Sequence, residues 1–329
     1  MKKILLLCLC YMIPIGLLAQ DPHFSQYFAS PLSLNPANTG YFDGDLRVAI
    51  NERQQWWTVG YNYNTASLSA DAKILSSYIP DNDVLAIGFS GIFDRTLNGA
   101  LSSNYISISG AYHKSLADQK TQVLTVGFQF TYANRHIDYS RLTFASQFDG
   151  NGFDLTIPVL VNSNNSSTNY FDAHAGILYS AIIQKTKIYA GTSLYHIARP
   201  VESIFTPSGS RVPLRATFHT GGDIYINPSS SILFSGMYMA QANARDEMVG
   251  VAYGIKNHNY TSTFNLYLGL WLRVNDSYIP YLGFDYQNFS LGLNYSLPYS
   301  SNLNYRPSAL EVSLIFRRNA AMSDFCPRF

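Results

Sequence analysis

The segment Val123–Tyr132, with the sequence VLTVGFQFTY, alternates between two kinds of side chain along its length. Every second residue is large and apolar, namely Leu124, Val126, Phe128, Phe130 and Tyr132. The residues between them are polar, small or β-branched, namely Val123, Thr125, Gly127, Gln129 and Thr131. Successive side chains of a strand point to opposite faces, whereas a helix repeats about every 3.6 residues. The segment is therefore predicted to be a strand with one apolar face and one polar or small face.

The same alternation recurs along the rest of the chain, for example in Phe264–Leu272 and Phe289–Leu297. It predicts fourteen strands, near residues 45–55, 61–73, 84–94, 101–114, 122–134, 169–183, 187–197, 215–226, 231–241, 246–255, 262–273, 277–287, 289–297 and 308–318. Strands of soluble proteins have about 5–6 residues, whereas a tilted strand that crosses a membrane needs about 9–11. The lengths and the even number predict an all-β fold, an antiparallel transmembrane outer-membrane β-barrel of 14 strands.

The predicted connections differ in length in a regular way. If the first strand begins in the periplasm, the long connections 135–168 and 198–214 both fall on the outer side of the membrane. The short connections 184–186, 227–230 and 256–261 all fall on the periplasmic side. Long outer loops and tight periplasmic turns are typical of outer-membrane barrels.

Composition agrees with a barrel wall that faces lipid. Of 329 residues, 47% are apolar and only 13% are charged, against about 25% charged in ordinary soluble domains. With 22 basic and 21 acidic residues the formal net charge is only +1, which is too small to attract nucleic acid. The 25 tyrosines fit aromatic girdles at the two interfaces. Candidates for these girdles are Trp56, Trp57, Tyr61, Tyr278 and Tyr281.

The first nineteen residues are predicted to be a secretory signal peptide. Lys2 and Lys3 precede an apolar run, Ile4–Leu18, and Ala19 offers a small residue for cleavage. Both cysteines of this run follow a leucine, which disfavours a lipoprotein signal. After cleavage only Cys326 remains, so no internal disulfide is expected. No later stretch is apolar enough for a transmembrane helix.

Few residues suggest catalytic or metal chemistry. His174, His196 and His219 lie in neighbouring predicted strands, so a barrel hydrolase of the Ser–His type is conceivable. Hydrogen-bonded histidines inside the lumen are the preferred interpretation. The run Asp149–Asp154 resembles a calcium loop weakly but lacks the EF-hand spacing, and a surface turn explains it better. We therefore predict no catalytic residue, no cofactor and no metal.

The segment 20–43 is unlike the predicted strands that follow it. It contains Pro22, Pro31 and Pro36, and proline removes the N–H that a strand must donate. It is nevertheless too apolar for a free tail, with Phe24, Tyr27, Phe28, Leu32 and Leu34. We expect it to pack into the periplasmic mouth or the lumen as a plug, or to dock on a partner. The predicted division is thus 1–19 signal peptide, 20–43 plug or periplasmic segment, 44–318 barrel and 319–329 periplasmic tail.

The two ends of the mature chain carry the most specific motifs. They read Asp21-Pro22-His23-Phe24-Ser25-Gln26-Tyr27-Phe28, then Pro31–Gly40, and finally Cys326-Pro327-Arg328-Phe329. With these motifs the chain closely resembles the PorP/SprF family of outer-membrane proteins, which is associated with the type IX secretion system and gliding motility of Bacteroidota. Weaker similarities lie between them, at Gln55-Trp56, Ile137-Asp138, Leu142–Phe144, Asp172–Tyr179, Gly191, Ser193, His196 and Pro200. One departure is Ala309-Leu310-Glu311, where the family usually has a histidine before the glutamate.

The resemblance implies an outer-membrane, non-catalytic accessory of protein secretion. Such proteins help particular cargo, such as gliding adhesins, to reach or stay at the cell surface. The implied partners are periplasmic and outer-membrane components of the apparatus, the secreted cargo and the lipid bilayer, with no nucleic acid and no small-molecule substrate. The residues assigned to partner binding or the plug are Asp21, Pro22, His23, Phe24, Gln26, Tyr27, Asn35, Pro36, Cys326, Pro327, Arg328 and Phe329. For Cys326 three roles remain as alternatives: a free thiol, an intermolecular disulfide or a packing residue. The alternative function is a passive porin or solute channel.

Overall fold

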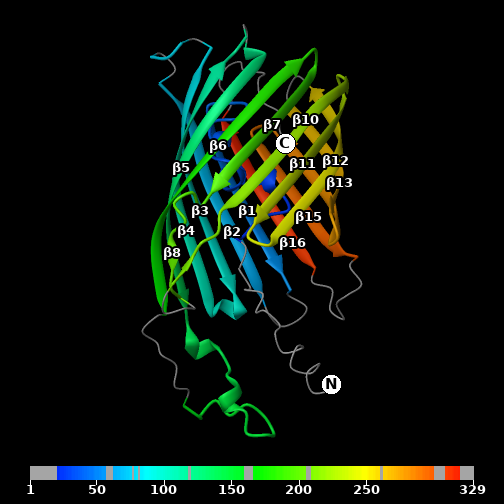
Figure 1. The fold of residues 1–329 in the computed structure, drawn as a ribbon. Helices are drawn as coiled ribbons and strands as arrows, with labels where there is room; N and C mark the ends of the chain where they lie inside the picture. Colours follow the sequence, from blue (N-terminus) through cyan, green and yellow to red (C-terminus); the bar gives the residue numbers. More distant parts are fainter. Residues whose placement is uncertain are drawn as a thin grey trace, which may run out of the picture.

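The computed structural model describes residues 21–56, 62–75, 78–80, 82–117, 120–158, 166–204, 209–259, 262–299 and 308–318. Fourteen antiparallel strands close into one barrel (Figure 1). The strands are β1 Leu46–Gln55, β2 Tyr63–Ile74, β3 Val84–Thr96, β4 Leu101–Ser115, β5 Gln122–Ile137, β6 Ser167–Ile183, β7 Thr186–Tyr195, β10 Arg215–Asn227, β11 Ser230–Gln241, β12 Ala244–Asn259, β13 Ser262–Arg273, β14 Ser277–Tyr286, β15 Phe289–Pro298 and β16 Ala309–Arg318. The predicted fold and strand number are confirmed.

The barrel is an up-and-down meander in which each strand pairs with the next strand of the wall. It closes between the first and last strands, with Leu46 opposite Arg318 and Gln55 opposite Ala309. The connection between β7 and β10 contains a two-stranded sheet outside the wall, made of β8 Val201–Glu202 and β9 Ser210–Arg211. Closure leaves the wall with no unpaired edge, as a barrel in lipid requires.

Side chains alternate between the outside and the lumen, as strand geometry dictates. On β5 the outward Phe128 and Phe130 are 57% and 62% exposed, whereas the intervening Gln129 is buried in the lumen. The outward side chains of the wall therefore form an apolar belt. Within the described residues, no helix is long and apolar enough to span a membrane.

The connections confirm two different ends of the barrel. The end that carries the long connection after β5, with its short helices η6 Tyr139–Arg141 and η7 Ala145–Gln147, is called the loop end (Figure 1). The opposite end, with tight connections such as the one between Ile183 and Thr186, is called the turn end. By the usual asymmetry of such barrels, the turn end faces the periplasm.

Residues 21–45, called the plug from here on, lie inside the barrel. They form η1 Tyr27–Ala29, α2 Pro31–Leu34 and η2 Pro36–Asn38. Pro31 and Pro36 each stand in the first turn of their helix, where no N–H is needed. The plug therefore uses short helical turns rather than strands.

One girdle prediction is wrong. Tyr281 points into the lumen, where it is 9% exposed and packs against Phe28 of the plug, while Tyr278 is 48% exposed on the outside. The physical reason is register, because a shift of three positions on a strand reverses the face. Trp56 is described and 45% exposed. Trp57 and Tyr61, like the signal peptide and the tail 319–329, lie outside the described residues.

Candidate functional site

The plug crosses the lumen from one end to the other. Asp21 lies at the loop end, where its backbone N–H donates to Gln241 Oε1 at 2.9 Å. Asp45 lies at the turn end, where its N–H donates to the carbonyl of Arg318 at 3.1 Å. The plug makes no ladder with any strand of the described wall. Side chains of the lumen must therefore hold it, and these form the candidate site.

Glu311 on β16 binds two successive backbone amides of the plug. Its Oε1 accepts the N–H of Ser25 at 2.7 Å and its Oε2 accepts the N–H of Gln26 at 2.8 Å. The carboxylate is completely buried and lies 3.3 Å from Nε of Arg53. Hydrogen bonds to an ionised acceptor are stronger than neutral ones. One strand residue thus fixes the backbone of the plug at Ser25 and Gln26.

The Gln26 side chain completes this contact. Its Nε2 donates to the carbonyl of Glu311 at 3.2 Å, and its Oε1 accepts from Ser313 Oγ at 2.6 Å. Gln26 is completely buried. A buried amide with both ends hydrogen-bonded specifies one register of the plug on β16.

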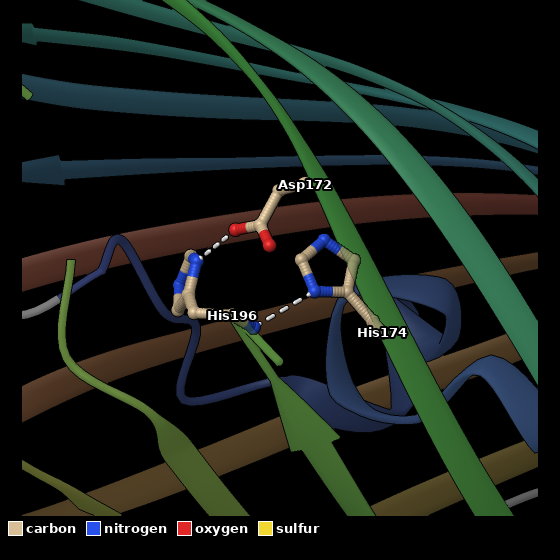
Figure 2. A group of neighbouring side chains, drawn as sticks. All are labelled: Asp172, His174 and His196. Atoms are coloured by element: carbon tan, nitrogen blue, oxygen red, sulfur yellow. Dashed lines mark hydrogen bonds and ion pairs between the residues drawn. The ribbon is translucent and has the colours of Figure 1, made fainter. Parts of the chain in front are cut away.

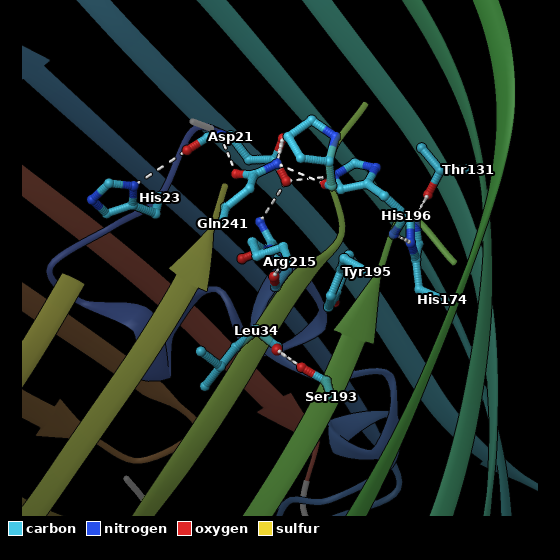
Figure 3. Close-up of polar contacts among 12 residues, drawn as sticks. Asp21, His23, Leu34, Thr131, His174, Ser193, Tyr195, His196, Arg215 and Gln241 are labelled. Atoms are coloured by element: carbon cyan, nitrogen blue, oxygen red, sulfur yellow. Dashed lines mark hydrogen bonds and ion pairs between the residues drawn. The ribbon is translucent and has the colours of Figure 1, made fainter. Parts of the chain in front are cut away.

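A second group of charges holds the start of the plug. The Asp21 cluster consists of Asp21, His196, Arg215 and Gln241 (Figure 3), together with Asp172 (Figure 2). Asp21 Oδ2 lies 2.6 Å from His196 Nε2 and accepts from Arg215 at 3.0 Å. His196 Nδ1 contacts Asp172 Oδ2. Both ring nitrogens of His196 face carboxylate oxygens, which cannot donate when ionised, so both nitrogens carry hydrogens and the ring is an imidazolium.

The charges of this cluster support one another. Burial by itself lowers the pKa of His196, but the Asp21 carboxylate and the hydrogen bonds to Asp172 and Asp21 outweigh it and raise the pKa to about 9. Burial likewise raises the pKa of Asp21, but His196 and Arg215 outweigh it and hold that pKa well below its usual range. Asp21 is therefore bound as a carboxylate between two cations.

Asp172, His174 and His196 also satisfy the distance criterion for a metal site, with ligand atoms within 4.8 Å of one another (Figure 2). Their lone pairs are already used. His174 Nδ1 accepts the backbone N–H of His196 at 3.0 Å, and His174 Nε2 lies 2.8 Å from Thr131 Oγ1. With His196 protonated at both nitrogens, the arrangement favours a hydrogen-bonded network over a bound cation.

The third predicted histidine lies apart from this pair. His219 Nε2 is 3.0 Å from Asn35 Nδ2 of the plug. Among the described residues, no serine hydroxyl hydrogen-bonds His174, His196 or His219. The Ser–His hydrolase hypothesis therefore finds no nucleophile there. The weak calcium loop is a pair of turns, with Asp149 Oδ1 accepting the N–H groups of Asn151 and Gly152.

Two aromatic residues of the plug, Tyr27 and Phe28, pack against the wall. The Phe28 ring centroid lies 5.6 Å from that of Trp271 and 5.5 Å from that of Tyr281. Tyr27 is buried and its hydroxyl donates to Ser235 Oγ at 2.7 Å. These inward aromatic side chains replace the solvent that an open lumen would hold.

Glycines of the wall let the plug approach the strands closely. A Cβ at Gly176 would lie 1.8 Å from Asn35 Oδ1, and one at Gly127 would lie 2.4 Å from the backbone nitrogen of Ala37. Asn35 is completely buried, and its Nδ2 donates to the carbonyls of Ile177 and Thr192 at 3.1 and 3.2 Å. Its side chain also caps η2 by accepting from the N–H of Ala37.

At the turn end, the plug packs on a buried ion pair. Arg47 binds Asp71 through two nitrogens, at 2.8 and 2.9 Å, and donates to the carbonyl of Asn38 at 3.0 Å. Asp71 also accepts the N–H of Gly40 at 2.7 Å. Two cavities of about 40 and 20 Å³ lie in the lumen beside the described plug, enough for only a few waters.

The structure brings most of the predicted site residues to this interface. Pro22 and His23 lie near the loop end, where His23 Nε2 is 3.0 Å from Asp246, and Phe24 is 2% exposed. Asn35 and Pro36 contact the wall at mid-height. Cys326, Pro327, Arg328 and Phe329 lie outside the described residues.

Sequence reasoning missed the wall residues that bind the plug, above all Glu311, Arg215 and Asp71. A signal was present, because each is a charge within a strand predicted to cross lipid. Such a charge is costly on the lipid face, so it must face the lumen and have a partner. Identifying that partner requires the fold.

A family model for "Type IX secretion system membrane protein PorP/SprF" matches residues 17–316. No curated protein matches the sequence significantly. Among solved structures, the Ralstonia pickettii toluene transporter TbuX is similar, with a TM-score of 0.48, 11% identity, and coverage of 88% of this chain and 94% of that chain. The Pseudomonas putida toluene transporter TodX has a TM-score of 0.47 and 8% identity, with coverage of 90% of this chain and 93% of that chain. A Pseudomonas aeruginosa FadL homologue has a TM-score of 0.46 and 10% identity, with coverage of 86% of this chain and 92% of that chain.

Proposed function

The chain belongs to the PorP/SprF family of type IX secretion system membrane proteins, and we propose that it is a closed, non-catalytic barrel of that system that supports secretion or surface anchoring of particular cargo. It is a multi-pass protein of the outer membrane. Its family associates it with the components of the secretion apparatus. The proposed cargo is a secreted surface protein such as a gliding adhesin.

The observation that carries this proposal is the filled lumen. A passive channel needs a continuous polar path, whereas the plug occupies the lumen from Asp21 to Asp45. Glu311 and Arg215, which would line an open pore, are buried against the plug. These contacts favour an accessory that acts through its surfaces over a porin that acts through its lumen.

The test separates secretion from conduction. In the native host, deletion of the gene is expected to remove specific proteins from the cell surface or the medium, and the wild-type gene is expected to restore them. The purified wild-type barrel in planar bilayers is expected to show only background conductance. Unchanged exported proteins together with steady solute conductance would establish the porin instead.

A variant without the plug tests cargo export and conductance together. Removal of residues 21–40 is expected to open the barrel and to impair cargo export. The control is Glu52→Gln, since Glu52 is exposed on the outer face of β1 and touches no plug residue. Loss of the plug with unchanged barrel stability and unchanged export would show that the plug has no part in this function.

A further inference from the structure

The long connection after β5 carries an ordered aromatic hairpin, defined as residues 147–155. Phe148 and Phe153 form an antiparallel bridge, and Asp154 N–H donates to the carbonyl of Gln147 at 2.8 Å. Gln147 at the start of the hairpin is buried, and its Nε2 donates to the carbonyl of Ile157 at 3.2 Å. This segment is thus a hairpin held together by its own hydrogen bonds.

The hairpin exposes large apolar side chains away from the lipid belt. Phe148, Phe153 and Leu155 are 53%, 56% and 69% exposed. The two phenyl rings pack edge to face with centroids 5.3 Å apart. Figure 1 shows this part of the connection projecting well beyond the loop end of the barrel, clear of the ends of the strands. Apolar side chains held out in water on a fixed hairpin are typical of a protein interaction surface.

The charge of the connection restricts the partner. Residues 138–158 contain Asp138, Asp149 and Asp154 against Arg141, three acidic groups minus one basic group. Arg141 already binds Asp138 at 3.1 Å. Backbone N–H groups of Asn151 and Gly152 lower the pKa of Asp149, and the hydroxyl and N–H of Thr156 lower that of Asp154. Two carboxylates without a cationic partner among the described residues therefore flank the phenyl rings.

We propose that the aromatic hairpin is the cargo-docking element of this barrel, and that it binds an exported protein domain whose apolar pocket is rimmed by lysine or arginine side chains. Phe148, Phe153 and Leu155 would fill the pocket, and Asp149 and Asp154 would meet the basic rim. The fixed hairpin lowers the ordering cost of binding. This inference rests on the proposed function and names the surface through which it operates.

The charges argue against two other occupants. The outer surface of a membrane rich in phosphate groups repels carboxylates placed beside the inserting rings. A second copy of the hairpin would bring identical carboxylates together, which costs rather than gains free energy. A basic protein partner satisfies both the apolar and the acidic parts of the surface.

The experiment uses the full chain in cells of the native host. The photoreactive residue p-benzoylphenylalanine replaces Phe148 or Phe153, and in the control it replaces Tyr78, an 85% exposed aromatic residue at the turn end. We expect one defined exported protein to be cross-linked from 148 and 153 but not from 78. Its adduct should fall about tenfold in Asp149→Asn/Asp154→Asn, which keeps the side-chain oxygens that accept the turn hydrogen bonds, and in high salt.

A second set of variants links docking to export. Phe148→Ala/Phe153→Ala is expected to release the same exported protein from the surface while the amount of folded barrel in the outer membrane is unchanged. An adduct only with lipid or with another copy of the chain, no adduct above the Tyr78 control, or an adduct insensitive to charge and salt would each overturn the docking proposal. If gene deletion leaves all exported proteins in place, the proposed function itself fails; if deletion removes them but the hairpin variants do not, only the docking proposal fails.

Discussion

The two ends of the plug are held in different ways. At the turn end, the plug continues directly into β1 and packs on the buried Arg47–Asp71 pair. At the loop end it is bound by side chains alone, through Glu311 and the Asp21 cluster. A covalent tether keeps the turn end close to its site even when its contacts break. The loop end has no such tether in the described chain, so it is the end at which charge changes should release the plug.

The largest expected effect follows from Glu311→Ala. This change leaves two buried N–H groups of the plug without their acceptor and removes the carboxylate that forms an ion pair with Arg53. Arg53 keeps its hydrogen bonds to the carbonyl of His23 and to Gln55 Oε1. Removing one partner of a buried ionic contact typically costs about 3–5 kcal/mol. The loop end of the plug should detach, giving new protease cleavage in residues 21–30 and measurable conductance. Glu52→Ala, on the outer face of the same barrel, is the matched control, and equal behaviour of the two variants would contradict the role of Glu311.

The next effect is a dependence on pH confined to the loop end. The pKa of His196, which lies beyond the end of β7, is about 9 in the folded protein against an ordinary value of 6.5. The stabilisation that protonated His196 gives to the folded protein is therefore complete below about pH 6.5 and is lost as the pH rises through about 9. The pKa of Asp21 is lowered, so its contribution is present above about pH 4 and is lost as the pH falls.

Hydrogen exchange measures this dependence. After correction for intrinsic exchange rates, the amides of Ser25 and Gln26 should lose protection between pH 7 and pH 10. The free energy of opening at these amides should fall by up to roughly 3 kcal/mol if His196 accounts for the whole effect. The amides of Asn38 and Gly40 at the turn end should change much less. In His196→Gln the difference between pH 7 and pH 10 should disappear. Parallel loss of protection at both ends would instead indicate opening of the whole barrel.

A smaller effect is expected at mid-height from Gly176→Ala. The new methyl group would lie 1.8 Å from Asn35 Oδ1 and must displace that side chain from its three hydrogen bonds to the wall. Overpacking of this kind costs about 1–3 kcal/mol. Gly110→Ala is the control, since its methyl group would meet nothing closer than 3.8 Å. Thermal unfolding in detergent should separate the two variants, and equal melting temperatures would show that the contact at Gly176 relaxes freely.

The smallest effect is expected where the plug joins the wall at the surface. Asp45 binds Arg318 at 2.9 Å, and this hydrogen bond lowers the pKa of Asp45, but both side chains are exposed. Exposed ion pairs contribute little to stability. Asp45→Asn should therefore leave both the melting temperature and the protection of Gly40 unchanged. A clear loss of protection at Gly40 would mean that the covalent tether alone does not hold the turn end.

The fold was predictable from the sequence to a large degree. Alternation is a local property, so the apolar and polar faces of a strand such as Val123–Tyr132 can be read from ten consecutive residues. The positions of the long connections then indicated the two ends of the barrel. The girdle assignment of Tyr281 is wrong because it put Tyr278 and Tyr281, three positions apart on one strand, on the same face. The alternation itself puts Tyr281 on the opposite face, where it packs against Phe28 of the plug.

The sequence by itself determined that the chain forms a lipid-facing barrel, because strand period, strand length and charge depletion are read residue by residue. It also predicted that residues 20–43, with three prolines, differ from the strands, because proline positions are read directly from the sequence. Only the tertiary structure decided what this segment contacts. Glu311 lies 285 positions from Gln26 and Arg215 lies 194 from Asp21, and no local rule relates residues so distant. Closure of the barrel brings these charges together, and their burial makes each one depend on its partner.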